Sequence, residues 1–512
     1  MSGQFAMVLS PVPIVPAGQG GDEAVPAEAG GLLAQAVAGP GLWEDLLGEL
    51  RRAGLIAELL ADGVIARAVA QAEHGHKLDR ALTAEVTAMA VIVGALFPDQ
   101  GYDLILARTF AMPGLPVKPG TVTPSGPALS KARVLLGEQV MRRIFEIDAA
   151  RADADLGIGA AWHEMEVTAI DGTTIELFND AELAEAFGVP TGGTKPKLRI
   201  TAHVRTASRR WIAAAAVGGY LDGENTLADE LEQSFTGGIL NTADREFFSM
   251  DRWIRFSARG AHLAWRVKNG AKSVPFKTLR TLKDGSELVL LRESGSMLGK
   301  RRRESGDKTL PRLPDTVARL VSFTVTTGTA RRVKTSVIKV LTTLLDPQEF
   351  PASEIAALYA RRWQVEIAFL HLKKTVKGTG RTLRGRSVTL ARQEAWALLL
   401  IHNMTAAIAA RAAGQAGMDP RLIPFTAVLA LIRGHVTADT RCPHCDRRPA
   451  SGNDPIALLV NQVLAQPAHR DRPARTSGRT AFQRQHWHTE EVTYTITMVP
   501  PNLPKANIRP GS

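Results

Sequence analysis

The spacing of hydrophobic positions predicts helices early in the chain, after a start with little pattern. Residues 1–40 are rich in Gly, Pro and Ala, which is typical of a flexible leader. From residue 42 to about residue 151, apolar side chains recur at helical spacing in three sets, 46–59, 86–93 and 130–147. The last set begins at Ser130, a residue type that caps helices, and contains the basic pair Arg142 and Arg143. We therefore expect an all-α N-terminal module over residues 41–155.

Near residue 164 the period changes from helical to strand-like. Residues 164–170 form one strand-like run, which ends at Asp171-Gly172-Thr173. Residues 198–205 alternate between apolar and polar side chains, typical of a half-buried strand, and residues 211–217 form a more apolar strand. A helix (223–235), a short strand that runs into Asp244, a helix (252–259) and a strand (262–267) follow. This order predicts an α/β layer with a mixed sheet over residues 156–270.

The later part of the chain divides into three segments. Residues 271–347 hold strand-like runs at 287–291, 318–326 and 335–343, so we expect an all-β insertion that also carries a run of basic residues, Lys300-Arg301-Arg302-Arg303. Pro351 then introduces a long helix, 352–376, and a second apolar helix covers 392–413, so residues 348–430 predict a return to the α/β layer. Residues 431–512 form a C-terminal extension that is Pro- and Arg-rich and expected to be partly disordered.

Charge and composition narrow the classes of function. The 62 Lys and Arg outnumber the 51 Asp and Glu, giving a net charge of +11. Residues 1–50 hold six acids and no Lys or Arg, so their charge of −6 leaves +17 on the rest of the chain. Such an excess favours a polyanionic partner, although an unspecialised basic surface would give the same count. No apolar run of transmembrane length and no basic signal-peptide start appear, and two cysteines suit a reducing cytoplasm.

The most informative pattern lies on the predicted helix 352–376. At 100° per residue, Tyr359, Arg362, Glu366 and Lys373 fall within one arc of about 60°. An apolar stripe lies beside this arc and consists of Leu358, Val365, Phe369 and Leu372. A carboxylate between cations can hold a metal ion while its neighbours hold phosphates. The alternative is a solvated helix face with an ordinary i,i+4 ion pair between Arg362 and Glu366.

Two aspartates upstream favour the metal site. Asp171 and Asp244 each follow a predicted strand, so folding can bring both to one edge of a sheet and add Glu366 from the helix. Three carboxylates supply hard oxygen ligands, which suit Mg²⁺ or Mn²⁺ better than zinc. Two such ions about 4 Å apart can activate an attacking oxygen and stabilise the leaving oxygen of a phosphodiester.

These residues carry a resemblance to a known family. The spacing Tyr359-x2-Arg362-x3-Glu366-x6-Lys373 resembles the Y-R-E-K signature of the IS4-type DDE transposases. Asp171-Gly-Thr-Thr and Asp244-Arg-Glu-Phe-Phe-Ser are similar to that family's two aspartate motifs. Leu96-Phe-Pro-Asp-Gln-Gly-Tyr and the following helix resemble its N-terminal domain. The similarity covers about residues 40–410.

The resemblance implies a fold and an activity. It implies a DNA-binding N-terminal domain and an RNase H-like catalytic domain, built from residues 156–270 and 348–430 and interrupted by the insertion. Asp171, Asp244 and Glu366 would bind two Mg²⁺ or Mn²⁺ ions, and cut-and-paste transposition would follow at the terminal inverted repeats and in target DNA. Arg362 and Lys373 would hold phosphates, and Tyr359 would pack or hydrogen-bond against the DNA end.

Further expectations concern partners and location. The basic run Lys300-Arg301-Arg302-Arg303 would contact the DNA backbone. A homodimer would act on paired ends, without a membrane, in the cytoplasm and associated with the nucleoid when DNA-bound. Two other functions stay open: a metal-dependent nuclease of the same fold that never joins strands, and a non-catalytic DNA-binding protein derived from a transposase.

Three local features stay open in the sequence. Glu246 stands where relatives often have Gly, so it places an extra carboxylate near the site. No tryptophan lies between Trp265 and Trp363 to hold a flipped base, so a hairpin route is undecided, with Phe276, Phe323 or Phe350 as substitutes. Cys442-Pro-His-Cys445 resembles half of a zinc knuckle, but only His435 and His444 lie near to complete it, so unliganded thiols are favoured.

Overall fold

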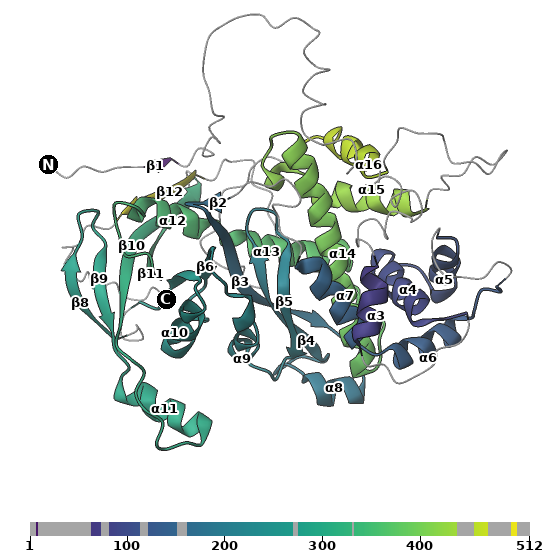
Figure 1. The fold of residues 1–512 in the computed structure, drawn as a ribbon, viewed down its shortest axis with the longest axis horizontal. Coiled ribbons are helices and arrows are strands. Elements are labelled where there is room, and N and C mark those ends of the chain that lie inside the picture. The colour runs from purple at the N-terminus through teal and green to yellow at the C-terminus, as the bar shows by residue number, and fades with distance from the viewer. Residues whose placement is uncertain are drawn as a thin grey trace, which may run out of the picture.

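The computed structural model describes residues 7–8, 63–72, 81–112, 121–150, 161–269, 275–329, 332–437, 455–468 and 493–498. Its centre is one mixed sheet of 12 strands, with the main order β1-β12-β10-β11-β7-β6-β3-β4-β5 and helices on both faces (Figure 1). The expected α/β class is therefore confirmed at this level. Residues 46–59 and the Cys442–Cys445 motif lie outside the described residues, as does most of the C-terminal extension.

The described N-terminal residues between 63 and 150 are helical. Their elements are α3 (Val64–Gln71), α4 (Ala84–Leu96), α5 (Tyr102–Phe110), α6 (Gly126–Leu136) and α7 (Gln139–Ala149). The single helix expected at 130–147 is wrong, because Gly137 adopts a left-handed φ of 74° and separates α6 from α7. These helices pack beside α14 in Figure 1, and their apolar side chains share one hydrophobic core with α14, β4 and β5.

The first half of the sheet alternates strands and helices. It contains β2 (Ala161–Trp162), β3 (Met165–Glu176), α8 (Ala181–Phe187), β4 (Lys197–Arg205), β5 (Trp211–Gly219), α9 (Glu224–Asp229), η3 (Glu232–Ser234), β6 (Ile239–Ala243), α10 (Met250–Ala258) and β7 (His262–Arg266). Helix α8 was not predicted from the sequence. Strand β4 was predicted to be half-buried, which is wrong, because helices cover both faces of the sheet and its polar residues Thr201 and His203 are fully buried.

The insertion is not all-β. It comprises β8 (Phe276–Thr281), β9 (Glu287–Leu291), α11 (Gly295–Ser305), β10 (Thr316–Thr329) and β11 (Arg332–Thr342). The Ser294 hydroxyl caps α11 by accepting from Met297 N, and Gly306 ends the helix with a left-handed φ of 73°. Only Leu298 of α11 is buried, so no apolar period marked this helix in the sequence. The hairpin β10–β11 extends the main sheet, since β11 pairs with β7.

The helix expected at 352–376 is broken into three parts. They are α12 (Ala352–Ala360), α13 (Trp363–Leu370) and the π-helical η5 (His371–Val376). The break falls at Arg361 and Arg362, whose amides bond three residues back, to Leu358 O and Tyr359 O. The expected apolar stripe is confirmed, because Leu358, Val365, Phe369 and Leu372 are all buried.

The remaining elements are α14 (Val388–Gln415), η6 (Pro420–Leu422), α15 (Phe425–Thr437), α16 (Pro455–Leu464), and the paired strands β1 (Met7–Val8) and β12 (Thr493–Met498). The apolar helix expected at 392–413 is confirmed as α14. This helix is long and apolar enough to cross a membrane, but 83% of its most apolar window is buried inside the protein. That burial is what a core helix requires, so its composition reflects packing.

Candidate active site

Strand register brings Asp171 and Asp244 together. Strands β3 and β6 are parallel neighbours, and their pairing ends with Ile170 opposite Ala243. The next residue on each strand is the aspartate, so the two carboxylates leave adjacent strands at the same level. The expectation that Asp244 follows a strand is confirmed. Asp171 instead lies inside β3, because this strand continues to Glu176 by pairing with β4.

Strand alternation decides which face the aspartates occupy. Val167 and Ala169 of β3 contact the cores on the side of α12, α13 and α14, whereas Ile170 contacts the core under α9 and α10. Since successive side chains alternate between faces, Asp171 points toward α12 and α13. Asp244 follows the same rule on β6, where Leu240 faces α12. The helices that carry the Y-R-E-K pattern therefore cover the two aspartates.

Arg362 joins Glu366 to this pair. Its Nη1 atom lies 3.5 Å from Asp171 Oδ2, and its Nη2 atom donates to Glu366 Oε1 over 3.0 Å. The i,i+4 ion pair expected from the spacing is thus present. It does not lie on a solvated helix face, because the Arg362 side chain is only 13% exposed and also approaches Asp171. The structure thus relates the three predicted carboxylates through neighbours, with Asp171 beside Asp244 in the strand register and Arg362 between Asp171 and Glu366.

Burial and mutual repulsion shape the charges of this cluster. Burial raises the pKa of Glu366 to about 7, with Asp171 and Asp244 adding to the rise and Arg362 opposing it. Burial also raises the pKa of Asp171, against the opposing effect of Arg362. Burial opposes the charge on Arg362, but Tyr359 and the three acids hold the pKa of the guanidinium above its ordinary value. The cluster therefore concentrates negative charge that one arginine only partly offsets.

Tyr359 and Lys373 lie behind and beside the cluster. The Tyr359 ring is buried against Phe323, and its hydroxyl donates to Ala243 O over 3.5 Å, just before Asp244. Burial raises the pKa of Tyr359 to about 12, so the phenol keeps its proton. Burial lowers the pKa of Lys373, as do Lys374 and Lys197, whereas Asp171 raises it. Tyr359 thus supports the end of β6, and the DNA contacts expected for both residues stay predictions.

The basic run lies on α11, which Figure 1 shows away from strands β3 and β6. Its members are not equivalent. Arg301 pairs with buried Glu293 at 2.6 Å, and Arg302 donates to Leu310 O, so both hold the insertion together. Lys300 and Arg303 are exposed. A role of this run in binding DNA stays a prediction, and the exposed pair suits it best.

The extra carboxylate of Glu246 points away from the cluster. Its side chain is 54% exposed, lies 2.9 Å from Lys268 Nζ and pairs with Arg245. Of the three phenylalanines considered as substitutes for a base-holding tryptophan, Phe323 is buried and Phe350 packs on Trp162. Phe276 is partly buried against the core under α9 and α10. The hairpin route stays untested.

Glu224 is the residue that the sequence patterns missed. It begins α9, and no hydrogen bond of its carboxylate is found among the described residues. A Cβ atom placed on Gly172 would lie 1.8 Å from Glu224 Oε1, so this carboxylate packs against β3 at the residue after Asp171, on the opposite face of the strand. Burial, and then Asp171, raise the pKa of Glu224. A glycine after a site aspartate was the available signal, because glycine marks a close approach.

Arg266 was also missed. Its strand, β7, pairs in parallel with β6, and its Nη1 atom lies 3.7 Å from Asp244 Oδ1. The same register that aligns Asp171 with Asp244 aligns Arg266 as the next residue along the sheet edge. Asp244 is therefore flanked by a carboxylate on one neighbouring strand and a guanidinium on the other.

The donor set fits a hard divalent cation. Asp171, Asp244 and Glu366 offer carboxylate oxygens, which Mg²⁺ and Mn²⁺ prefer. As the side chains are placed, no group of three or more His, Cys, Asp or Glu among the described residues closes around one point, and Arg362 lies between two of the acids. Ions held here would therefore displace the Arg362 guanidinium from one carboxylate, leaving it to pair with an anion. The possible zinc ligands near the C-terminus give no zinc site among the described residues. His435 Nε2 lies 2.9 Å from Gln462 Oε1, and Cys442, His444 and Cys445 fall outside the described residues.

Comparisons with known proteins point to transposases. Residues 162–404 match the family described as Transposase DDE domain, and residues 51–146 match Insertion element 4 transposase N-terminal. The chain is 27% identical over 354 residues to "Transposase InsG for insertion sequence element IS4" of Escherichia coli (strain K12), covering 68% of this chain and 75% of that protein. It is 24% identical over 143 residues to "Putative transposase InsZ" of the same organism, covering 27% and 48%.

One solved structure is similar at low level. "Cryo-EM structure of piggyBac transposase synaptic complex with hairpin DNA (SNHP)" matches with a TM-score of 0.37 and 10% identity, over 80% of this chain and 83% of that chain. At this TM-score the similarity supports no further conclusion.

Proposed function

Since the chain belongs to the IS4 family of DDE transposases, we propose that the cluster of Asp171, Asp244 and Glu366 cuts DNA at the ends of an insertion element and joins them to target DNA. Members of this family are enzymes that cleave DNA and transfer its strands. The observation that supports the assignment to these residues is the register of β3 and β6, in which Asp171 and Asp244 follow a pair of opposite residues, together with Arg362, which lies near both Asp171 and Glu366.

The chemistry needs two phosphoryl transfers. In the first, a water oxygen bonds to phosphorus, the bond between phosphorus and the 3′ oxygen breaks, and the 3′ oxygen takes a proton. In the second, the oxygen of this 3′-hydroxyl bonds to a target phosphorus and loses its proton. The bond from that phosphorus to the 3′ oxygen of the target strand breaks, and this oxygen takes a proton. Divalent ions bound by the three carboxylates would supply activation of the attacking oxygen and charge stabilisation of the leaving oxygen.

The surrounding residues would hold and orient the DNA. Arg362 can form paired hydrogen bonds to a phosphate once its carboxylate partners bind cations. Lys373 adds a positive charge beside Asp171. Tyr359 keeps the end of β6 in place through Ala243 O, and we expect it to meet the DNA end only if the helix break at Arg361 opens. The net charge of +11 supports a DNA partner.

The finer parts of the proposal have separate support. An RNase H-like catalytic domain is supported by the order β5-β4-β3-β6-β7, in which three antiparallel strands are followed by two parallel ones. We propose Mg²⁺ or Mn²⁺, two ions per site, terminal inverted repeats and target DNA as ligands, and a homodimer on paired ends. Helices α3–α7 would bind DNA, and the protein would act in the cytoplasm, bound to the nucleoid.

The direct test is cleavage of DNA that carries the element's ends by the purified full chain. We expect nicking that requires Mg²⁺ and stops with a chelator, and we expect Asp244→Ala to reduce it to background. Glu185→Ala, which removes an exposed carboxylate of α8 outside the helices proposed to bind DNA, is the control and should cleave normally. Full activity of Asp244→Ala would refute the site assignment.

A strand-transfer assay separates the proposal from the nuclease alternative. The transposase should join the cut 3′ end to a plasmid, whereas a nuclease would only nick. A non-catalytic DNA-binding protein would do neither, and its DNA affinity would not depend on Mg²⁺. Joined products would therefore exclude both alternatives.

Gly172→Ala should lower cleavage through Glu224. The added Cβ would overlap Glu224 Oε1 at 1.8 Å, so the carboxylate must leave its place against β3, one residue beyond Asp171. A shift of about 1 Å near reacting groups can cost about 10²-fold in rate, so we expect a loss of roughly ten- to a hundredfold in cleavage rate. Gly237→Ala, where an added Cβ meets nothing within 4 Å, should change neither rate nor melting temperature. Equal rates for both variants would exclude a role for the Glu224 position.

A further inference from the structure

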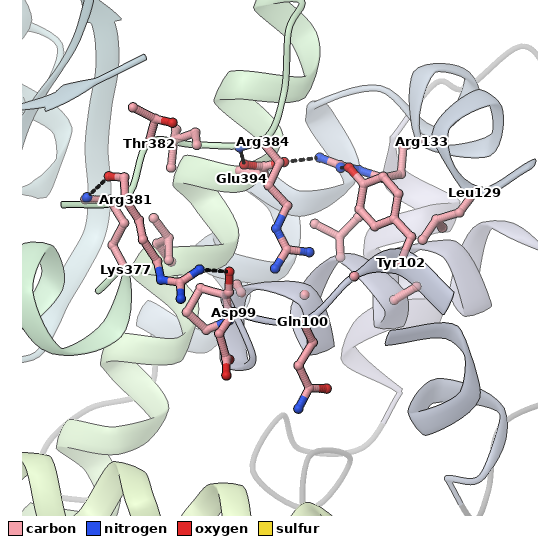
Figure 2. Close-up of a pocket in the computed structure, with 18 of the residues that line it drawn as sticks. Asp99, Gln100, Tyr102, Leu129, Arg133, Lys377, Arg381, Thr382, Arg384 and Glu394 are labelled. Carbon is pink, nitrogen blue, oxygen red and sulfur yellow. Dashed lines mark hydrogen bonds and ion pairs between the residues drawn. The ribbon is translucent and has the colours of Figure 1, made fainter. Parts of the chain in front are cut away.

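A cavity of about 480 Å³ lies between the N-terminal helices and the segment that follows η5. Its walls come from α4, the α4–α5 turn, α6, the loop at residues 377–384 and the start of α14 (Figure 2). This volume falls within the range of about 300–1,000 Å³ that is typical of small-molecule sites. None of the residues in the Y-R-E-K pattern lines it.

The cavity carries more positive than negative charge. Lys377, Arg381, Arg384 and Arg133 line it, against the acids Asp99 and Glu394. Both oxygens of Glu394 are used, since Oε1 accepts from Arg133 Nη2 and Oε2 from Arg384 N. An anion that enters would therefore meet mainly cations.

Two of these cations keep donors for a ligand. Arg384 donates from Nη2 to Phe97 O, and Arg381 donates from Nη1 to Pro98 O, so both approach the end of α4. Their other guanidinium nitrogens find no acceptor among the described residues, and a guanidinium binds phosphate best through two parallel hydrogen bonds. Lys377 contributes charge, while its ammonium donates to Gly378 O and Arg381 O.

An aromatic ring forms the wall beside these cations. The Tyr102 ring centre lies 5.8 Å from the Arg384 guanidinium carbon and 5.7 Å from that of Arg133, and Figure 2 shows Arg384 between Asp99 and this ring. Buried Arg133 fixes the ring, because it donates to the Tyr102 hydroxyl and to Gln393 Oε1. The neighbouring wall is apolar, with Ala90, Leu129 and Leu398. The flat ring of a ligand can therefore stack on Tyr102 in the same cavity in which the arginines can bind a phosphate.

We propose that this cavity binds a single nucleotide, with its phosphate on Arg381 and Arg384 and its base against Tyr102. Aromatic stacking accepts any base, so the proposal names no base preference. The nucleotide could belong to the bound DNA strand or be a free nucleoside phosphate, and the experiment separates the two sources.

The position of the cavity favours a nucleotide of the DNA. Lys377 is one helical turn beyond Lys373, which lies near Asp171. Phe178, which lines the cavity, follows Asp171 by seven residues on and after β3, or about 20 Å at strand rise. At about 3.4 Å per nucleotide, that distance is roughly six nucleotides from the reacting phosphodiester. The site is thus separate from the acids, and its use with DNA rests on the proposed function.

Calorimetric titration of the full chain with deoxyadenosine 5′-monophosphate, without metal, tests the site itself. We expect saturable binding that is at least roughly tenfold tighter than binding of deoxyadenosine or of inorganic phosphate, because both parts of the nucleotide are held. Gly101→Leu should abolish it, since Gly101 lines the cavity and an added Cβ there meets open space at an ordinary φ of −67°. Gly237→Leu, at another glycine with open space, is the control and should bind normally.

A second variant protects the test against misfolding. Arg384→Gln should weaken the monophosphate roughly tenfold but leave deoxyadenosine unchanged, a split that a general loss of structure would not give. Thermal unfolding should show the same melting temperature for Gly101→Leu and Gly237→Leu. Equal affinity for inorganic phosphate and the monophosphate, or unchanged binding in Gly101→Leu, would overturn the proposal.

The source of the nucleotide is decided with end DNA carrying 2-aminopurine at successive positions. A fluorescence change confined to one position several nucleotides from the cut, lost in Gly101→Leu, would assign the site to the DNA strand. Monophosphate binding without such a change would assign it to a free nucleotide. Both assays can use Glu366→Gln protein, so a failure of cleavage would not affect them.

Discussion

Replacing Glu366 with glutamine is expected to abolish strand cleavage and leave DNA binding nearly unchanged. The change keeps the size and one oxygen of the side chain but removes the charge that Arg362 meets at 3.0 Å and that a divalent ion would need. Metal-assisted stabilisation is worth several kcal/mol, so we expect a loss on the order of 10³-fold or more in cleavage rate. Single-turnover cleavage of end DNA and a binding titration measure the two quantities.

The control for this variant is Glu185→Gln, an exposed glutamate of α8. It should match the unmodified protein in both assays. Cleavage by Glu366→Gln within tenfold of the unmodified rate would remove Glu366 from the reaction. A parallel loss of DNA binding would instead mean that the carboxylate holds the fold or the DNA, and would contradict the catalytic role.

Lowering the pH from 7.5 to 4.5 should destabilise the protein strongly through a buried histidine. His203 of β4 is fully buried, with Nδ1 2.7 Å from Ser234 Oγ and Nε2 2.7 Å from Thr168 Oγ1. Burial, and then Arg205, lower the pKa of His203 from 6.5 to about 3. The unfolded chain therefore binds a proton below pH 6.5 that the folded chain refuses. The stabilisation is complete above pH 6.5 and is lost as the pH falls toward 3.

The expected size follows from that difference in pKa. At pH 4.5, about two pH units below the unfolded value, this histidine alone should cost about 3 kcal/mol of unfolding free energy, at order-of-magnitude precision. Burial likewise keeps the pKa of His402 in α14 well below 6.5, so the two effects add in direction. Urea unfolding at pH 7.5 and 4.5 measures the total.

A comparison of variants isolates His203 from the carboxylates that also titrate in this range. His203→Gln should be less stable at pH 7.5 but lose markedly less stability on acidification. His163→Gln, at a partly exposed histidine, should keep the full pH dependence. If His203→Gln and the unmodified protein lose equal stability between the two pH values, the buried neutral histidine is not responsible.

The sequence predicted the parts of the site that follow from short-range patterns. Asp244 lies directly after a strand, and Arg362 and Glu366 are one helical turn apart, so spacing predicted their local positions. The choice of a site over a solvated helix face depended on the two aspartates and the family resemblance. The positions of Tyr359 and Lys373 were harder to predict. The 100° spacing per residue assumes a continuous helix, and the break at Arg361 interrupts it. At this break, backbone amides donate to the carbonyl three residues back instead of four. A run of apolar and basic side chains gives no sequence signal for that change.

Contacts between distant segments could not be predicted. Glu224 approaches β3 next to Asp171 only because Gly172 leaves room for its carboxylate, and no pattern along the chain connects residues 172 and 224. Helix α11 was missed for the opposite reason, since it makes few contacts and needs no apolar stripe. Both cases show that the spacing of apolar residues predicts which positions are buried. It does not predict a polar side chain at a site, or a helix that is mostly exposed.

The packing of the N-terminal helices determines how the protein would measure distance along DNA. Arg133 of α6 is buried between Gln393 and Glu394 of α14, and the side chains around it belong to one continuous core. Helices packed in this way cannot move as a separate unit relative to α14. A DNA sequence bound by these helices would therefore lie at a constant distance from the three acids. The cut would then fall at a set number of base pairs from that sequence.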